Sequence, residues 1–297
     1  MPAYDVFVVL ASVQDVEQAL RAQDYLPDHG LTTAIYLALA MGRPLLLEGE
    51  AGVGKTEVAK TLATVLDARL IRLQCYEGID AHEALYEWDY SRQLLYVRAL
   101  QAGEVDARSR VDELYGPEFL LERPLLEAVR AGPSAVLLVD ELDRADDEFE
   151  AFLLEVLSDF AVTVPELGTI AAEAPPAVIV TSNRTRELHD ALKRRCLYHW
   201  IDFPDLEREV AIIRLRAPGV SESLARSVAE GIARLRELDL TKPPGVAEAI
   251  DWAQALALLG AESLDGDGAL TEETLGWAVK NHDDLRRARE ALPALLE

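Results

Sequence analysis

The sequence predicts an α/β fold in which helices cover a mostly parallel sheet, followed by an all-helical region. Two observations predict this class. Short apolar or β-branched runs alternate with amphipathic stretches as far as Pro204, and beyond Pro204 only helical patterns remain. The runs are continuously apolar rather than alternating, which is typical of strands buried on both faces in a parallel sheet. The expected strands are residues 43–49, 69–76, 134–141, 176–183 and 197–203.

Amphipathic stretches supply the expected helices. Residues 56–68 (TEVAKTLATVLDA) and 146–160 (DDEFEAFLLEVLSDF) have helical spacing of their apolar positions, and four or five further helices are expected after Pro204. A chain of 297 residues suits one large and one smaller domain. We therefore expect an α/β domain over residues 1–204 and a helical lid domain over residues 205–297.

The charge balance bears on the choice of partner. The net charge of -24 arises from 53 acidic and 29 basic residues, and such a surface repels a phosphate backbone. An acidic surface also simply keeps a protein in solution. The charge therefore argues against nucleic acid as a partner without identifying another one.

The remaining composition predicts a soluble cytoplasmic protein. No segment approaches the roughly 20 apolar residues that a membrane span requires. The apolar run near the start lacks a basic region before it and is flanked by Asp5 and Asp15, which argues against a secretory signal. Cys75 and Cys196 have no CxxC spacing, so neither a zinc knuckle nor a disulfide framework is expected.

A glycine-rich segment follows the first expected strand and precedes a helix. It matches the phosphate-binding pattern GxxxxGK[ST], the P-loop, in full. Glycines let successive backbone N–H groups turn inward toward an anion at a helix N-terminus. The lysine is expected at the β- and γ-phosphates of ATP, and the threonine hydroxyl on Mg²⁺. The segment is Gly49, Glu50, Ala51, Gly52, Val53, Gly54, Lys55 and Thr56, with Glu57 directly after it.

Two further strands end in polar residues. The run AVLLV ends in Asp140 and Glu141, at the edge where ligands of such sheets bind. Asp140 is expected to hold Mg²⁺ together with Thr56, and Glu141 to orient and polarise the attacking water. Asn183 ends the next strand, and its amide is expected at the γ-phosphate or the water. In isolation, Asp140 and Glu141 would also suit a helix N-cap, and Asn183 a turn.

The order of these elements resembles that in AAA+ ATPases, and several longer sequence segments resemble those of the MoxR family and its CoxD-like subgroup. The similar phrases are PLLLEGEAGVGKTEVAK, RLQCYEGID, ALYEWDYSRQLL, FLLERPLLEAV and DFAVTVPELGTI, within residues 25–290. The resemblance implies an AAA+ core and a hexameric homo-oligomeric ring. It also implies a von Willebrand factor A domain partner and a client metalloenzyme, here a molybdenum-containing hydroxylase of the carbon monoxide dehydrogenase type.

The resemblance also implies arginine roles. Arg195, or Arg194 as a substitute, matches the arginine finger that enters a neighbouring subunit's site; a solvated basic helix end is the alternative. Arg286 is the candidate for the sensor 2 arginine over the nucleotide. A surface pair with Asp283 or Asp284 is the alternative for Arg286.

Two segments are expected to face the client. Residues 80–98 correspond to the helix-2 insert of this clade, and residues 160–172 are expected to form a β-hairpin. Tyr86, Trp88 and Tyr90 recur at every second position, which suits either a grip on a polypeptide or a packed face.

Two other functions stay open at this point. One is an AAA+ motor that acts on DNA, against which the acidic surface argues. The other is a scaffold that binds ATP without turnover, against which the set of Asp140, Glu141 and Asn183 argues.

Overall fold

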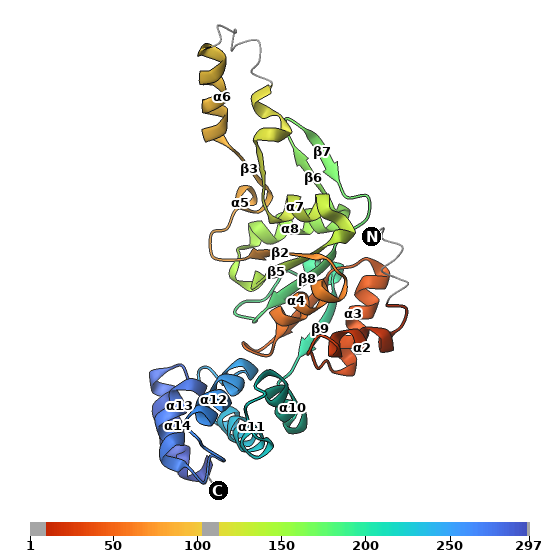
Figure 1. Ribbon diagram of the computed structural model, residues 1–297. Coiled ribbons are helices and arrows are strands. Elements are labelled where there is room, and N and C mark those ends of the chain that lie inside the picture. The colour runs from red at the N-terminus through yellow and green to blue at the C-terminus, as the bar shows by residue number, and fades with distance from the viewer. Residues whose placement is uncertain (1–9, 103–112, 296–297) are drawn as a thin grey trace. The chain divides into compact units, whose positions relative to one another are not determined.

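A computed structural model describes residues 10–102 and 113–295 of the chain (Figure 1). Residues 6–9 of the apolar run at the start of the sequence lie outside this part, and Leu10, the next residue of the run, is buried. Within the described residues, no helix is long and apolar enough to cross a membrane.

Five strands form one sheet, and each corresponds to an expected strand. Their order across the sheet is β2-β5-β8-β1-β9, and β2 with β5, β5 with β8 and β8 with β1 are parallel pairs. The predicted fold class, a parallel-sheet α/β P-loop fold with helices toward the C-terminus, is confirmed. The strands are β1 (Leu45–Gly49), β2 (Arg69–Gln74), β5 (Ala135–Asp140), β8 (Ala177–Ser182) and β9 (Leu197–Ile201).

The register of the sheet aligns the polar strand ends. All six residues of β5 are buried, which explains its unbroken apolar sequence up to Asp140. Gln74 at the end of β2 stands opposite Asp140, and Glu48 of β1 stands opposite Ser182 of β8. Parallel pairing therefore brings the carboxyl ends of β2, β5, β8 and β1 to one edge.

Helices and short 3-10 turns connect these strands. Helix α4 begins inside the P-loop motif, and η4 follows β5 after the single residue Glu141. The helices are α2 (Val13–Arg21), α3 (His29–Met41), α4 (Lys55–Val65), α5 (Ala81–Leu85), α6 (Tyr90–Ala102), α7 (Pro124–Ala131), α8 (Asp147–Asp159) and α9 (Asp190–Arg195), with 3-10 turns η2 (Pro117–Phe119), η3 (Gly132–Ser134) and η4 (Leu142–Arg144).

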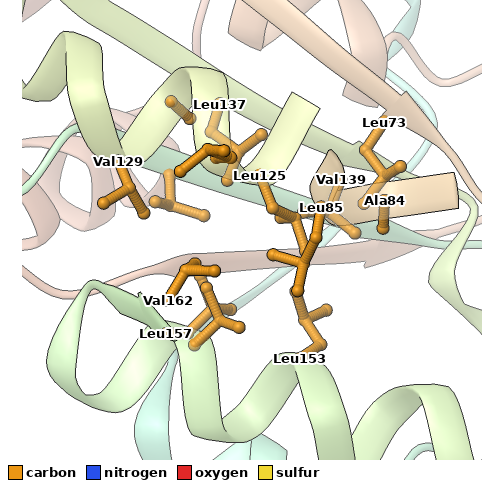
Figure 2. Close-up of a cluster of buried hydrophobic side chains, with 14 of the residues drawn as sticks. Leu73, Ala84, Leu85, Leu125, Val129, Leu137, Val139, Leu153, Leu157 and Val162 are labelled. Carbon is orange, nitrogen blue, oxygen red and sulfur yellow. The ribbon is translucent and has the colours of Figure 1, made fainter. Parts of the chain in front are cut away.

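An apolar core lies between the sheet and helices α7 and α8. Figure 2 shows Leu125 of α7, Leu137 of β5 and Leu153 of α8 among its side chains, and all three are buried. Burial of each leucine contributes about 1.5–3 kcal/mol, so this cluster fixes β5 firmly against the helices. The strand that carries Asp140 is therefore held by its own apolar residues.

Residues 81–102 and 113–122 include a small separate sheet and a projecting helix. Strand β3 (Tyr86–Trp88) pairs antiparallel with β4 (Leu120–Glu122), and α6 begins at Tyr90 (Figure 1). The every-second-residue pattern of aromatics thus stops at Trp88, which is buried and packs edge-on against Tyr86 and Tyr115. The alternative of a packed face therefore holds for Tyr86 and Trp88, whereas the expectation was wrong for Tyr90, which belongs to the helix rather than the strand.

Residues 161–171 contain two short antiparallel strands. Strand β6 (Ala161–Val164) pairs with β7 (Gly168–Ala171), and Gly168 has a φ of 80°, which a glycine adopts without strain. Val162 and Val164 are buried while Thr163 is exposed, so one face of this hairpin packs on the core.

After β9 the described chain is helical. A second apolar core includes Ile213, Val228 and Trp252, and the indole of Trp252 donates a hydrogen bond to the Thr274 hydroxyl at 2.9 Å. These helices are α10 (Leu206–Arg216), α11 (Glu222–Glu237), α12 (Val246–Leu258), α13 (Gly268–Ala278) and α14 (His282–Leu295).

The chain divides into two compact units. One contains the described residues of Met1–Ala19, Asp28–Glu48 and Thr56–His199, and the other contains Leu20–Pro27, Gly49–Lys55 and Trp200–Glu297. The glycine loop, Gly49–Lys55, thus belongs to the same compact unit as the C-terminal helices. The domain boundary at residue 204 stays a prediction.

Candidate active site

The P-loop joins β1 to α4. Gly52 and Gly54 have φ values of 81° and 95°, a backbone region that glycine adopts readily and other residues avoid. The ammonium group of Lys55 donates to the carbonyl oxygens of Gly49 (2.8 Å) and Glu50 (2.7 Å), and its side chain is buried. The carbonyl oxygens at the start of the loop therefore bind the lysine at its end.

The other residues of the motif have ordinary surroundings. Val53 is buried, whereas Glu50 and Ala51 are exposed. Glu57 lies in the first turn of α4 and forms an ion pair with Lys60 at 3.3 Å. An exposed pair of this kind contributes little, so Glu57 serves mainly as an acidic residue at a helix start.

The start of α12 contacts the P-loop. The Val246 N–H donates to the carbonyl oxygen of Gly52 at 2.9 Å. A Cβ on Gly245 would lie 2.7 Å from the Cα of Gly52, closer than carbon atoms can approach. Two glycines thus permit a direct contact between backbones, which the sequence pattern did not indicate.

Thr56, the residue after Lys55, meets Asp140 of β5. The Thr56 hydroxyl donates to Oδ1 of Asp140 at 3.0 Å, and the Thr181 hydroxyl of β8 donates to the same oxygen at 2.6 Å. Asp140 is only 2% exposed. Hydroxyl and carboxylate oxygens are the ligands that Mg²⁺ prefers, so this pair fits the magnesium site expected from the sequence.

Glu141 leaves the strand in a left-handed conformation with a φ of 55°. Its N–H donates to the Thr181 hydroxyl at 2.9 Å, which fixes the backbone next to Asp140. Its carboxylate accepts from the Gln74 amide (3.1 Å) and from Arg144 (2.9 Å), and the bond to Glu141 raises the pKa of the Arg144 guanidinium. Glu141 is thus an oriented carboxylate whose side chain is 33% exposed.

Asn183 follows β8, and a buried carboxylate holds its backbone. Asp143 accepts from the Asn183 N–H at 3.1 Å, from the Thr185 N–H at 2.8 Å and from the Thr185 hydroxyl at 2.7 Å. Asp143 is 2% exposed. It ties η4 to the loop after β8, and so places Asn183 near the strand end that carries Asp140 and Glu141.

Sequence reasoning missed Asp143 and two residues of β2. Arg72 donates through Nε (3.0 Å) and Nη2 (2.6 Å) to Oδ2 of Asp140. Gln74, the next residue on the same face of β2, accepts from Arg72 and donates to Glu141. The available signal was the pair of polar residues at alternate positions, Arg72 and Gln74, with the apolar Leu73 between them.

Arg194 and Arg195 lie at the end of α9, and both are exposed. In the described part of the chain, neither guanidinium has a hydrogen bond or an ion pair. Their carbonyl oxygens accept three bonds from the Arg43 guanidinium, one at Arg194 (2.6 Å) and two at Arg195 (2.9 and 3.1 Å). A cation at a helix C-terminus is stabilising, so Arg43 holds this helix end in place.

Arg286 lies on α14 and takes the surface arrangement that the sequence left open. Its side chain is 69% exposed and lies 3.8 Å from the Asp283 carboxylate. Asp284 is buried and accepts the N–H groups of Thr241 (2.9 Å) and Lys242 (3.0 Å), which lowers its pKa. The contact with the P-loop is made by α12, and the sensor 2 role of Arg286 stays a prediction.

Comparison with known proteins finds distant relatives along most of the chain. It is 24% identical over 274 residues to the gas vesicle ATPase GvpN1 of Halobacterium salinarum, covering 87% of this chain and 75% of that protein. It is 26% identical over 323 aligned positions to the uncharacterized protein YehL of Escherichia coli, covering 97% and 82%. Among solved structures, the Holliday junction branch migration motor RuvB of Thermotoga maritima matches with a TM-score of 0.46 and 16% identity, covering 96% of this chain and 73% of that one.

A family model also matches. The model for the AAA domain of the dynein-related subfamily matches residues 44–196, a range that contains the P-loop, Asp140, Glu141 and Asn183. This range is more than half of the chain. The protein therefore belongs to the family of AAA domains, in the dynein-related subfamily.

Proposed function

We propose that this protein is a MoxR-type AAA+ ATPase that hydrolyses ATP in a ring of its own copies and remodels a client protein. The observation that carries the proposal is the hydrogen bond from Thr56 to Asp140, with Glu141 as the next residue. Membership of the AAA domain family supports nucleotide binding. The likeness to a protein named gas vesicle ATPase supports hydrolysis.

The residues divide the work on the triphosphate. The N–H groups of the glycine loop and the Lys55 ammonium would neutralise phosphate charge. Thr56 and Asp140 would hold Mg²⁺, which when bound supplies positive charge that offsets the β- and γ-phosphates. Lys55 already has its donors directed at the loop carbonyls of Gly49 and Glu50, so nucleotide binding would exchange these partners for phosphate oxygens.

Glu141 would orient the attacking water and accept its proton. Gln74 and Arg144 both bond the Glu141 carboxylate and restrict its direction, which is what a positioned base requires. Asn183 would bond the γ-phosphate or the water through its amide, and Asp143 fixes the backbone from which that amide extends.

Assembly would complete the site. Arg195, with Arg194 as the substitute, would enter the site of the neighbouring copy and neutralise charge on the transferred phosphoryl group. Both guanidinium groups are exposed on α9, which leaves them available to a second copy. A hexamer follows from the resemblance to MoxR proteins.

Helix α6 would offer a surface to the client. Tyr90, Leu94 and Leu95 on this helix are 68%, 53% and 65% exposed, an unusual density of exposed apolar side chains. An apolar surface of this kind suits a polypeptide better than nucleic acid. By resemblance to the CoxD-like subgroup, the client would be a molybdenum-containing hydroxylase, aided by a von Willebrand factor A domain protein.

Phosphate release from ATP tests the proposal. The parental protein should release phosphate in a Mg²⁺-dependent way, and duplex DNA should leave the rate unchanged. Glu141→Gln removes the base while keeping the shape, so hydrolysis should fall by about a hundredfold or more, with nucleotide binding retained. Glu148→Gln, an exposed acid on α8, is the matched control and should behave as the parent.

Three results would contradict this function. Phosphate release by Glu141→Gln at the parental rate would remove Glu141 from its role. A rate that rises severalfold with DNA would favour the DNA motor instead, and tight ATP binding without any release would favour the scaffold.

Client capture tests the remodelling step. Glu141→Gln, purified from the native host with ATP, should retain a bound polypeptide. Adding Leu94→Asp and Leu95→Asp should abolish that retention, because two charges interrupt the apolar surface of α6, while ATP binding is unchanged. Retention of the same polypeptide by the triple variant would exclude α6 as the client surface.

A further inference from the structure

The Asp140 carboxylate has all of its acceptor positions filled. Oδ1 accepts from the hydroxyls of Thr56 (3.0 Å) and Thr181 (2.6 Å), and Oδ2 accepts from Nε (3.0 Å) and Nη2 (2.6 Å) of Arg72. A carboxylate offers about four acceptor positions in total. Mg²⁺ or its bound water can therefore reach Asp140 only if one of these donors gives way.

The two hydroxyl donors are not the ones to leave. Thr181 is 1% exposed in the sheet and also accepts the Glu141 N–H, so its rotation would break a second bond. Thr56 can offer its oxygen to a metal ion while its hydroxyl proton still bonds Asp140. The other two donor atoms belong to one side chain, Arg72.

Arg72 has both the freedom and the reason to move. Its side chain is 51% exposed, and it already bonds a second partner, the Gln74 side-chain oxygen. A guanidinium on Oδ2 also repels a divalent cation at the same carboxylate. Arg72 and Mg²⁺ therefore compete for Asp140.

We propose that Arg72 is the counter-ion that occupies Asp140 while the nucleotide is absent, and that Mg²⁺ binding requires Arg72 to release this carboxylate. The inference rests on the proposed function, because it concerns the same site. It makes Arg72 a positioning residue that sets how much Mg²⁺ the site needs. Without Arg72, Asp140 would lose two of its four donors, and so would bind Mg²⁺ more readily.

A Mg²⁺ titration at saturating fluorescent ADP tests the inference without turnover. Arg72→Gln should lower the Mg²⁺ concentration at half-saturation by about tenfold, because the lost bonds to a charged group no longer oppose the metal. Arg72→Lys keeps the charge but loses the two parallel hydrogen bonds of the guanidinium. Its Mg²⁺ concentration at half-saturation should therefore lie between those of the parent and Arg72→Gln. Arg69→Gln on the same strand is the matched control, since Arg69 pairs with Glu127 on the surface at 2.9 Å, and should match the parent.

Thermal unfolding supplies a second readout. In EDTA without nucleotide, Arg72→Gln should unfold at a lower temperature than Arg69→Gln, and Mg²⁺ with ADP should remove the difference.

The possible results distinguish a failure of the role of Arg72 from a failure of the proposed function. A parent that binds Mg²⁺ and ADP, with Arg72→Gln needing as much Mg²⁺ as Arg69→Gln or more, would overturn the role of Arg72 alone. A parent that binds no ADP with or without Mg²⁺ would overturn the proposed function, and this inference with it.

Discussion

The carboxylate centre (Asp140, Glu141 and Asp143) and the end of α9 (Arg194 and Arg195) differ in how many hydrogen bonds their charged groups make. Asp140 accepts four hydrogen bonds and Asp143 accepts three from two residues of a neighbouring loop. The two arginine guanidinium groups, by contrast, have no partner among the residues that the structure describes.

This difference indicates which charged groups find their hydrogen-bond partners within one copy of the chain. The carboxylate centre is organised by residues of its own copy, whereas the two exposed guanidinium groups at the end of α9 are available to a second copy. A shared site between copies in a ring would have this division of labour.

Mixing two inactive variants tests that division and has the largest expected effect. Arg195→Ala should reduce ATP hydrolysis by about a thousandfold or more, if Arg195 acts on the neighbouring copy. Mixed with Glu141→Gln, it should regain part of the rate, because the Arg195→Ala copy keeps Glu141 and receives Arg195 from its neighbour. Phosphate release as a function of the mixing ratio measures this.

Arg194→Ala serves as the comparison for that mixture. If it abolishes hydrolysis while Arg195→Ala does not, the finger is Arg194. If mixing restores nothing at any ratio while both variants form rings, the arginines do not act between copies.

Removing Asp143 should weaken the carboxylate centre from within. Asp143→Ala removes the carboxylate that accepts the N–H groups of Asn183 and Thr185, which should lower the free energy of unfolding by about 1.5–3 kcal/mol. Urea unfolding of the variant, beside Asp159→Ala as an exposed control, measures the loss. Equal stability of the two variants would mean that the loop after β8 is held by other contacts.

The two cysteines report on the two regions, since Cys75 lies near Asp140 and Cys196 directly follows α9. Burial raises the pKa of the Cys75 thiol to about 12, and the nearby carboxylates, Asp140 first, act in the same direction. Burial also raises the pKa of the Cys196 thiol to about 12, although Arg43 acts in the opposite direction. Both thiols should therefore react with iodoacetamide at pH 8 about a thousandfold more slowly in the folded protein than in urea.

The same shifts predict a pH dependence of stability. A thiol whose pKa is raised in the folded state stabilises that state below its unfolded pKa, near 9, and loses this contribution as the pH rises toward 12. Unfolding free energy should fall by up to about 1.4 kcal/mol per thiol for each pH unit above 9. A variant with Cys75→Ala and Cys196→Ala should show a shallower decline, and an identical slope would contradict the assignment.

The fold and the P-loop were predictable because their signals are local. Continuous apolar runs predict buried strands, and the glycine pattern requires only eight consecutive residues. The same holds for Asp140 and Glu141, which end a run that is apolar over its whole length.

Arg72, Gln74 and Asp143 were missed because their roles depend on pairing between distant segments. Arg72 acquires its partner only when β2 lies beside β5, 68 residues further along the chain. Asp143 likewise depends on a loop 40 residues away. The position of Tyr90 was misjudged for a different reason. Strand β3 has only three residues before the helix begins, which is too few for the change from the two-residue period of a strand to the 3.6-residue period of a helix to be recognised in the sequence.

The contact between Gly52 and Gly245 has a consequence for how substitutions combine. A Cβ at Gly52 would come within 2.9 Å of the Gly245 Cα, and one at Gly245 within 2.7 Å of the Gly52 Cα. Neither position can accept even an alanine unless the opposite backbone retreats, and that retreat would stretch the bond from Val246 to Gly52. Tolerance at these two sites is therefore coupled through the shared contact, while Gly52 carries a second constraint of its own in its φ of 81°. A library that varies the two positions one at a time would not separate the shared contact from the backbone requirement at Gly52.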